Sequence, residues 1–289
     1  MKVLITGAGG QAGYELRRRA PAQIELLVLE RGRLDIADRT AVEQLVRAEK
    51  PELIINGAAY TAVDKAESEP EQAFAVNATG AAHLAAAATL VGARLIHIST
   101  DFVFDGANSS PYHPADRTNP LSVYGASKRA GEQAVLEHCP AALILRTSWL
   151  YSSHGQNFVK TMLRLQAERE QLTVIADQVG TPTWAGSLAQ ALWAAAARPE
   201  LHGLYHWSDG GVASWYDFAV AIQEEALGLG LLARAIPIQP ITTADYPLPA
   251  RRPAYSVLDK SAAWRDFGVA ATHWRVNLRK MLRELSDHA

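Results

Sequence analysis

Short apolar runs alternate with helical patterns through the first half of this 289-residue chain. The runs have the aliphatic composition of buried strands, and the segments between them repeat their apolar residues with the period of an amphipathic helix. Strands that alternate with helices in this way form a parallel sheet with helices on both faces. We therefore expect an α/β fold with a doubly wound parallel sheet. Its strands are expected at Lys2–Thr6, Glu25–Leu29, Leu53–Asn56, Arg94–Ser99 and Ala142–Arg146, and its helices at Gln11–Ala20, Arg39–Glu49, Gln72–Asn77 continuing to Leu90, and Val123–Glu137.

A glycine-rich turn, Thr6–Gly13, directly follows the first expected strand. Glycines allow the backbone to turn tightly and to approach a pyrophosphate, whose charge is then received by free N–H groups at the start of the next helix. A turn without a ligand would contain the same residues, but the strand–turn–helix context favours dinucleotide binding. The sequence therefore predicts a Rossmann-like NAD(P)-binding domain. Its candidate pyrophosphate-binding residues are Gly7, Gly10, Gln11, Ala12 and Gly13.

Charged residues follow the second expected strand, where folds of this kind bind the adenosine ribose. Glu30 is placed to accept hydrogen bonds from the ribose, which favours NADH. Arg31 and Arg33 come next, and a guanidinium there would bind the 2′-phosphate of NADPH. A solvated charged turn would contain the same residues, so both cofactors stay open. Further candidates for the cofactor site are Asp35 and Ile36 beside the adenine, and Ala58, Ala59, Tyr60 and Thr61 after the third strand.

Tyr124 and Lys128 are four residues apart in an expected helix, so they lie on the same helix face. An ammonium close to the phenol would lower its pKa from about 10 toward the range of a general acid. An exposed pair on a solvated helix is the alternative interpretation. Ser99 and Thr100 end the fourth strand at the same edge of the sheet. Their hydroxyls could simply cap the next segment, but with Tyr124 nearby Thr100 becomes a candidate second donor to a substrate carbonyl.

The remainder of the chain continues the alternation less regularly. Residues 1–147, with about 171–199, are expected to form the NAD(P)-binding domain, and residues 148–289 an interleaved substrate-binding region. The proline-rich segment Ile236–Pro253 is expected to be a loop, and its Arg251 and Arg252 suit either a diphosphate group or a solvated surface. Helices are expected at Asn157–Arg169, at Ala185–Ala197 and from a Ser214 cap to Leu227, and strands at Leu172–Ala176 and Leu204–Trp207.

Composition limits the classes of ligand. A net charge of −2 gives no basic surface for nucleic acid, so small molecules are the expected ligands. Cys139 is the only cysteine, which excludes an intrachain disulfide and agrees with a reducing compartment. No apolar run reaches the roughly 20 residues that cross a bilayer, and the first residues enter a strand directly rather than a leader. We expect a cytoplasmic protein that binds neither nucleic acid nor membrane.

Several motifs of this chain resemble those of the extended short-chain dehydrogenase/reductase family. The shared motifs are the glycine-rich turn, Ser99-Thr100-Asp101 and Tyr124–Lys128, in that order along the chain. Within this family the resemblance is closer to the dTDP-4-dehydrorhamnose reductases, and it extends over essentially the whole chain. The motifs that carry this closer resemblance are Ala59–Glu67, Ser99–Gly106, Arg146–Trp149 and Ala250–Pro253.

The resemblance implies an enzyme that reduces the 4-keto group of a dTDP-sugar, dTDP-4-dehydro-6-deoxy-L-mannose, with NADPH or NADH. It implies that Tyr124 protonates the nascent alkoxide, that Lys128 holds the nicotinamide ribose and lowers the phenol pKa, and that Thr100 hydrogen-bonds the keto oxygen. Tyr124 and Lys128 are thereby cofactor-binding residues as well. The residues implied to bind the substrate are Ser99, Thr100, Tyr124, Trp149, Arg251 and Arg252.

The resemblance also bears on assembly. Some members of the family are described as dimers joined through Mg²⁺ by three glutamates. Glu15 and Glu284 match the first and last of these positions, but Gly186 stands at the middle one. We therefore expect no metal site, and the homodimer is carried over only as a candidate assembly.

Two other functions suit the same scaffold. A nucleotide-sugar epimerase or dehydratase would keep NAD tightly bound and recycle it. A non-catalytic regulatory subunit, like that of methionine adenosyltransferase, would share the fold without turnover. Thr100 and the segment Thr147–Trp149 resemble the reductases instead, so the reductase is the preferred interpretation.

Overall fold

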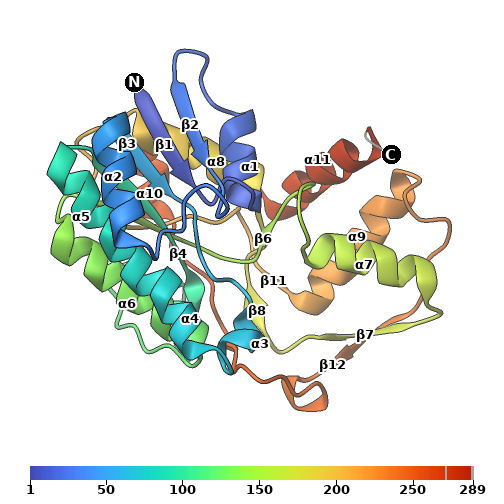
Figure 1. The fold of residues 1–289 in the computed structure, drawn as a ribbon. Helices are drawn as coiled ribbons and strands as arrows, with labels where there is room; N and C mark the ends of the chain where they lie inside the picture. The colour runs from blue at the N-terminus through green and yellow to red at the C-terminus, as the bar shows by residue number, and fades with distance from the viewer. Residues whose placement is uncertain (271, 288–289) are drawn as a thin grey trace.

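A six-stranded parallel sheet forms the centre of the computed structural model, which describes residues 1–270 and 272–287 (Figure 1). Its strands are β1 (Lys2–Thr6), β2 (Glu25–Leu29), β3 (Leu53–Asn56), β4 (Arg94–Thr100), β5 (Leu143–Thr147) and β10 (Gly203–His206). They lie in the order β10-β5-β4-β3-β1-β2, and every neighbouring pair is parallel. The direction of winding therefore reverses between β1 and β3. Such a reversal opens a crevice at the carboxyl edge of the sheet, where folds of this class bind ligands.

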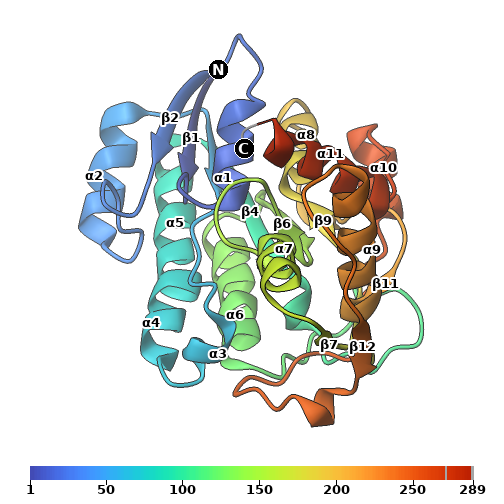
Figure 2. The same cartoon turned by 90° about the vertical axis from the view of Figure 1, so that its right-hand side faces the viewer.

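Both faces of the sheet are covered by helices, which explains the nearly continuous apolar strands. The helices are α1 (Gln11–Arg18), α2 (Arg39–Glu49), α5 (Ala81–Val91), α6 (Val123–His138), α8 (Ala185–Ala196) and α10 (Ser261–Phe267). Leu4 of β1 belongs to the core formed with α2, α5 and α6, which Figures 1 and 2 show together on one side of the sheet. Val3 and Ile5 belong to the core formed with α1, α8 and α10. The alternating direction of side chains along one strand thus separates the two layers.

The helical run between β3 and β4 contains a π-helical segment. It consists of α4 (Pro70–Phe74), the π-helix η1 (Ala75–Gly80) and α5. Close packing fixes its path, because a Cβ on Gly131 of α6 would lie 2.0 Å from the carbonyl oxygen of Asn77. The run Pro70–Val91 is long and apolar enough to cross a membrane by length and composition alone. In this fold it packs against α6 and α2.

A third core lies outside the central sheet, on the right of Figure 1. It is formed by α7 (Phe158–Glu168), β7 (Leu172–Ile175), α9 (Trp215–Gly228), β12 (Ile238–Ile241) and α11 (Trp274–Ser286). The predicted cap at the start of α9 is confirmed, because Ser214 and Asp217 exchange side-chain and backbone hydrogen bonds. Shorter elements lie in the connecting segments: α3 (Val63–Ala66), η2 (Asp101–Val103), β6 (Leu150–Tyr151), β8 (Val179–Gly180), β9 (Thr183–Trp184), β11 (Ala213–Ser214) and η3 (Thr243–Asp245).

The strands predicted for the first half of the chain are all present, and none of their ends differs by more than one residue. The predicted strand at Leu204–Trp207 is β10, which extends the sheet beside β5. The prediction that Ile236–Pro253 is a loop throughout is wrong, because β12 in this segment pairs with β7 outside the central sheet. β12 contains Pro240, and a strand with one neighbour accepts a proline that a central strand would not.

Candidate active site

The glycine-rich turn lies where the winding of the sheet reverses. Gly7 has a φ of +67°, and a Cβ there would lie 2.5 Å from the carbonyl carbon of Gly57 in the loop after β3. A Cβ on Gly13 would lie 2.5 Å from the Cα of Ala8. Both positions therefore require glycine for the two loops and α1 to pack. Gly10 is the N-cap of α1 and has no side chain that could cap it, so the first N–H groups of this helix suit an anion.

A cavity of about 750 Å³ extends from this turn across the ends of β4 and β5, and we call it the main cavity. Thr100 reaches it from the end of β4, and Tyr124 and Lys128 reach it from the first two turns of α6. The structure thus brings together three segments that are far apart in the sequence. The predicted site residues on its walls are Gly7, Gly10, Gln11, Ala12, Ala59, Thr61, Ser99, Thr100, Tyr124, Lys128, Trp149 and Arg252.

A smaller cavity of about 120 Å³ adjoins the same turn and is formed by the segment after β2 and the loop after β3. Arg31 lies on its wall. The side chain of Glu30 lies instead against the glycine-rich turn, since a Cβ on Gly9 would be 3.4 Å from the Glu30 Cδ. The predicted site residues on the walls of this cavity are Gly7, Asp35, Ile36, Ala58, Ala59 and Tyr60.

Three predicted site residues, Gly13, Glu30 and Arg251, line neither of these cavities. Arg251 is exposed, whereas the neighbouring Arg252 lies on the wall of the main cavity. Arg252 also forms two hydrogen bonds with Asp64, the shorter joining Nη2 to Oδ2 at 2.7 Å. This guanidinium holds the pKa of the Asp64 carboxyl below its usual value. Of the two arginines, Arg252 is therefore the one placed to meet a ligand.

Tyr124 is half-buried beside the end of β4, on the wall of the main cavity. Burial raises the pKa of its phenol to about 12, while a hydrogen bond with Thr100 lowers this pKa and the charge of Asp101 raises it. The expected lowering of the phenol pKa by Lys128 is not found. Lys128 instead donates from Nζ to the carbonyl oxygen of Ile98 at 2.7 Å, and burial lowers its own pKa to about 8. Burial is the largest cause of both pKa shifts, and neither group contributes to the shift of the other. Spacing along a helix does not reveal burial.

Thr100 and Ser99 both use their hydroxyls within the protein. The Thr100 hydroxyl accepts a hydrogen bond from the backbone N–H of Phe102 at 3.2 Å and so caps η2. The Ser99 hydroxyl donates to Glu132 at 2.6 Å, and Glu132 is held by Arg146 in a buried ion pair at 2.7 Å. The capping interpretation of the threonine is thus correct, although its side chain also lines the main cavity. Ser99 also lines the main cavity, but its hydroxyl proton is committed to Glu132.

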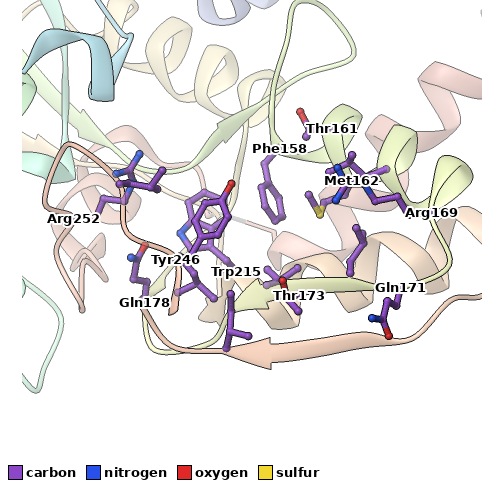
Figure 3. A pocket seen from close by; sticks show the side chains of 16 residues that line it. Phe158, Thr161, Met162, Arg169, Gln171, Thr173, Gln178, Trp215, Tyr246 and Arg252 are labelled. Atoms are coloured by element: carbon purple, nitrogen blue, oxygen red, sulfur yellow. The ribbon is translucent and has the colours of Figure 1, made fainter. Parts of the chain in front are cut away.

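An apolar pocket of about 610 Å³ lies between α7 and the β7–β12 pair (Figure 3). Trp215 and Arg252 line both this pocket and the main cavity, so the two spaces are adjacent. The ring of Trp215 stacks on that of Trp149, with centroids 3.6 Å apart and planes within 4°. No sequence motif predicted Trp215, Phe158 or Tyr246 as site residues. The only local signal was a tryptophan at the start of a capped helix.

The three positions implied for a metal are occupied by two carboxylates that pair with arginines and by a glycine. Glu15 is buried and accepts a hydrogen bond from Arg19 at 2.9 Å, and Glu284 accepts one from Arg18 at 2.9 Å. A Cβ on Gly186 would lie 2.8 Å from the guanidinium of Arg19. Both carboxylates are therefore neutralised by arginines. Within residues 1–270 and 272–287, no group of three or more His, Cys, Asp or Glu side chains could hold a metal ion.

Known proteins of similar sequence and structure define the family. The chain is 45% identical to the dTDP-4-dehydrorhamnose reductase of Sinorhizobium fredii, over 98% of this chain and 97% of that protein. A solved structure of a dTDP-4-dehydrorhamnose reductase from Clostridium acetobutylicum matches 99% of this chain and 100% of its own, with a TM-score of 0.94 and 40% identity. The one from Bacillus anthracis, in complex with NADP, matches 98% of this chain and 99% of its own, with a TM-score of 0.93 and 38% identity. The family model described as "RmlD substrate binding domain" matches residues 1–287, and the chain belongs to this family.

Proposed function

We propose that this chain reduces the 4-keto group of dTDP-4-dehydro-6-deoxy-L-mannose, also called dTDP-4-dehydro-L-rhamnose, to give dTDP-L-rhamnose. The hydride donor is NADPH or NADH. Relatives that match almost the whole chain are named as this reductase, and one was solved with NADP. The observation that carries the proposal is the convergence of Thr100, Tyr124 and Lys128 on the cavity that begins at the N-terminus of α1.

The residues at the sheet reversal suit a dinucleotide. The backbone of the loop after β3 lies so close to Gly7 that no side chain would fit there. Glycine therefore lines the end of the main cavity that suits the pyrophosphate. When bound, NADPH or NADH supplies the hydride that reaches C4 of the sugar. The smaller cavity suits the adenosine, and Arg31 on its wall suits a 2′-phosphate. The cofactor-binding residues are assigned as Gly7, Gly10, Gln11, Ala12, Gly13, Glu30, Asp35, Ile36, Ala58, Ala59, Tyr60, Thr61, Tyr124 and Lys128.

Tyr124 is assigned as the proton donor. Addition of hydride to C4 leaves an electron pair on the former keto oxygen, which takes the phenolic proton of Tyr124 to give the alcohol. A phenol pKa of about 12 keeps this proton in place at neutral pH, as a general acid requires, and the developing alkoxide is the stronger base. Thr100 orients the keto oxygen by a second hydrogen bond. Lys128 is assigned to hold the nicotinamide ribose.

The apolar pocket is assigned to the nucleoside end of the substrate. Figure 3 shows Arg252 at one end of this pocket, beside Tyr246 and Trp215. A diphosphate that crosses from this pocket to the main cavity would pass the guanidinium of Arg252, which suits its charge. The sugar would then lie beside Trp149, with its C4 toward Tyr124. Arg251 is kept as a more distant contributor to the positive potential.

The same proposal covers the organisation of the molecule. Residues 1–147, with the α8 part of the expected 171–199 segment, are assigned to cofactor binding, and the rest of 148–289 to an interleaved substrate-binding region. β7, which lies in the same segment, belongs to the substrate-binding region because it lines the apolar pocket. In support, α8 packs on the central sheet, while α7, α9 and β12 surround the apolar pocket or its core. A cytoplasmic location and a homodimer stay predictions.

Replacement of Tyr124 by Phe tests the proposal. The variant keeps the ring and loses only the acid, so kcat should fall by about 10²- to 10⁴-fold while the Kd for NADPH stays unchanged. The measurement follows NADPH oxidation in the presence of the 4-keto dTDP-sugar. Tyr205→Phe is a matched control, because its hydroxyl bonds Asp266 away from the cavity. Turnover near the wild-type rate in Tyr124→Phe would reject the assignment, and stoichiometric bound NAD without net NADPH oxidation would favour an epimerase.

A further inference from the structure

Four buried polar side chains connect the glycine-rich turn to Lys128. They come from three strands and one helix: Thr6 in β1, Asn56 in β3, His97 in β4 and Lys128 in α6. The Thr6 hydroxyl donates to Asn56 Oδ1 at 2.7 Å, Asn56 Nδ2 lies 2.9 Å from His97 Nδ1, and His97 Nε2 lies 3.4 Å from Lys128 Nζ. None of the four is more than 2% exposed. The proposed reaction assigns no role to Asn56 or His97.

The orientation of the Asn56 side-chain amide follows from its backbone neighbour. The backbone N–H of Ala58 points at one amide atom of Asn56 at 3.1 Å. A backbone N–H can only donate, so this atom must be the oxygen Oδ1. The other amide atom, Nδ2, therefore faces His97, and it can only donate.

The tautomer of His97 follows from the amide. Because Asn56 Nδ2 donates, His97 Nδ1 must accept and carries no proton. A ring whose Nδ1 carries no proton is neutral, and burial, which holds the pKa of His97 well below its ordinary value, favours the same state. A neutral imidazole has its proton on the other nitrogen. His97 therefore presents Nε2–H to Lys128.

An N–H group beside Lys128 discriminates between the two forms of this side chain. A neutral amine offers a lone pair to the N–H, whereas an ammonium offers only further donors. Both forms can donate to the carbonyl oxygen of Ile98. Burial lowers the pKa of Lys128 to about 8, and Glu132, one turn further along α6, raises it. Charged groups of both signs face this region. Arg146 and Arg129 pair with Glu132 and neutralise it, and the carboxyl group of Asp101 lies beside Tyr124.

We propose that His97 is a positioning residue for Lys128: its Nε2–H, oriented by Asn56, stabilises the neutral amine of Lys128 in the cofactor-free enzyme. The inference rests on the proposed function only for what Lys128 does with cofactor. The network joins the turn that receives the pyrophosphate to the group that meets the nicotinamide ribose. The ionisation of Lys128, and with it the pH dependence of cofactor binding, is therefore controlled by buried side chains of the central sheet.

The tautomer can be read directly from the intact protein. Long-range ¹H–¹⁵N correlation spectra of histidine-labelled enzyme distinguish the protonated from the unprotonated ring nitrogen, and the His97 signals are those absent from His97→Gln. We expect a neutral ring with Nε2 protonated near neutral pH. A proton on Nδ1, or on both nitrogens, would overturn the inference. This readout is independent of turnover, so it holds whether or not the reductase assignment is correct.

The pH dependence of NADPH binding tests the consequence. In His97→Gln the amide can turn its oxygen toward the ammonium, so the inflection assigned to Lys128 should move up by about one pH unit, a tenfold gain in proton affinity. His206→Gln is the matched control, because His206 is equally buried but contacts Arg146 and the carbonyl of Tyr112. Its inflection should not move. An unshifted inflection in His97→Gln overturns the inference, since a purely structural histidine would change stability and leave the inflection in place.

A second variant keeps the test decisive if His97→Gln does not fold. In Asn56→Asp the carboxylate still accepts from Thr6 and Ala58, but it cannot donate to His97. The ring should then reverse its tautomer and donate from Nδ1, leaving Nε2 as an acceptor for the ammonium. Retention of the Nε2–H form in the spectra of Asn56→Asp would show that Asn56 does not orient the ring, and would overturn the proposal.

Discussion

The two spaces that meet at Arg252 are built by different means. At the cofactor end of the main cavity the wall is backbone, brought so close at Gly7 that no Cβ would be accommodated, and Gly13 behind it is equally confined. The apolar pocket is walled by side chains, and two of them, Tyr246 and Leu248, are 55% and 38% exposed. A wall of backbone holds one shape, whereas exposed side chains change rotamer at little cost.

This difference predicts that affinity for cofactor and affinity for the dTDP-sugar can be changed independently. Changes at the glycine turn should act on NADPH binding and on stability together, because the same contacts serve both. Changes in the apolar pocket should act on substrate binding and leave the sheet intact. Three variants test whether the two affinities are independent.

The largest effect is expected from Gly7→Ala. The new Cβ would require a left-handed backbone for alanine and would collide with Gly57, costing about 3 kcal/mol or more of unfolding free energy. NADPH binding, measured by fluorescence titration below the transition temperature, should be lost. Gly32→Ala is the control, because a Cβ there has no neighbour within 4 Å, and its unfolding free energy should change by less than about 0.5 kcal/mol. Equal stability of the two variants would contradict the backbone-built wall.

An intermediate effect is expected from Arg252→Met. The charge-assisted contact to the substrate diphosphate is worth about 1.5–3 kcal/mol, so KM for the dTDP-sugar should rise by about ten- to a hundredfold. The Kd for NADPH should not change. Asp64, which loses its partner, is 38% exposed at the side chain and stays solvated, so stability should change little. Arg251→Met is the matched control, and an equal rise of KM in that variant would show that Arg252 has no special position.

The same difference explains what could be predicted from the sequence. β1, the turn and α1 are contiguous, so their pattern of apolar residues and glycines is visible in a short segment. Thr100, Tyr124 and Lys128 were recognised by their motifs, and the three side chains line one cavity. The role of each residue stays a prediction.

The apolar pocket could not be predicted in this way. β12 is a strand only because β7 lies beside it, and Trp215 reaches the cavity only because α9 packs on α7. These are tertiary events that override local propensity. The predicted lowering of the phenol pKa was wrong for a related reason, since the four-residue spacing of Tyr124 and Lys128 places them on one helix face but does not reveal burial. The link between His97 and Asn56 joins separate strands and has no local signature.

The smallest effect is expected from Trp215→Phe. Trp149 has a φ of +45°, uncommon for a residue with a side chain, and its ring lies between Trp215 and the backbone of Gly180. Loss of a stacked pair costs about 0.5–1.5 kcal/mol, so KM for the dTDP-sugar should rise by about two- to tenfold through a less ordered Trp149. Circular dichroism should show loss of the exciton signal of two stacked indoles, and Trp264→Phe, on the opposite core, should retain it. If KM stays normal although the exciton signal is lost, the stack of Trp149 on Trp215 does not position the sugar. A raised Kd for NADPH would mean that the two spaces are coupled, which the backbone-built wall of the cofactor end does not allow.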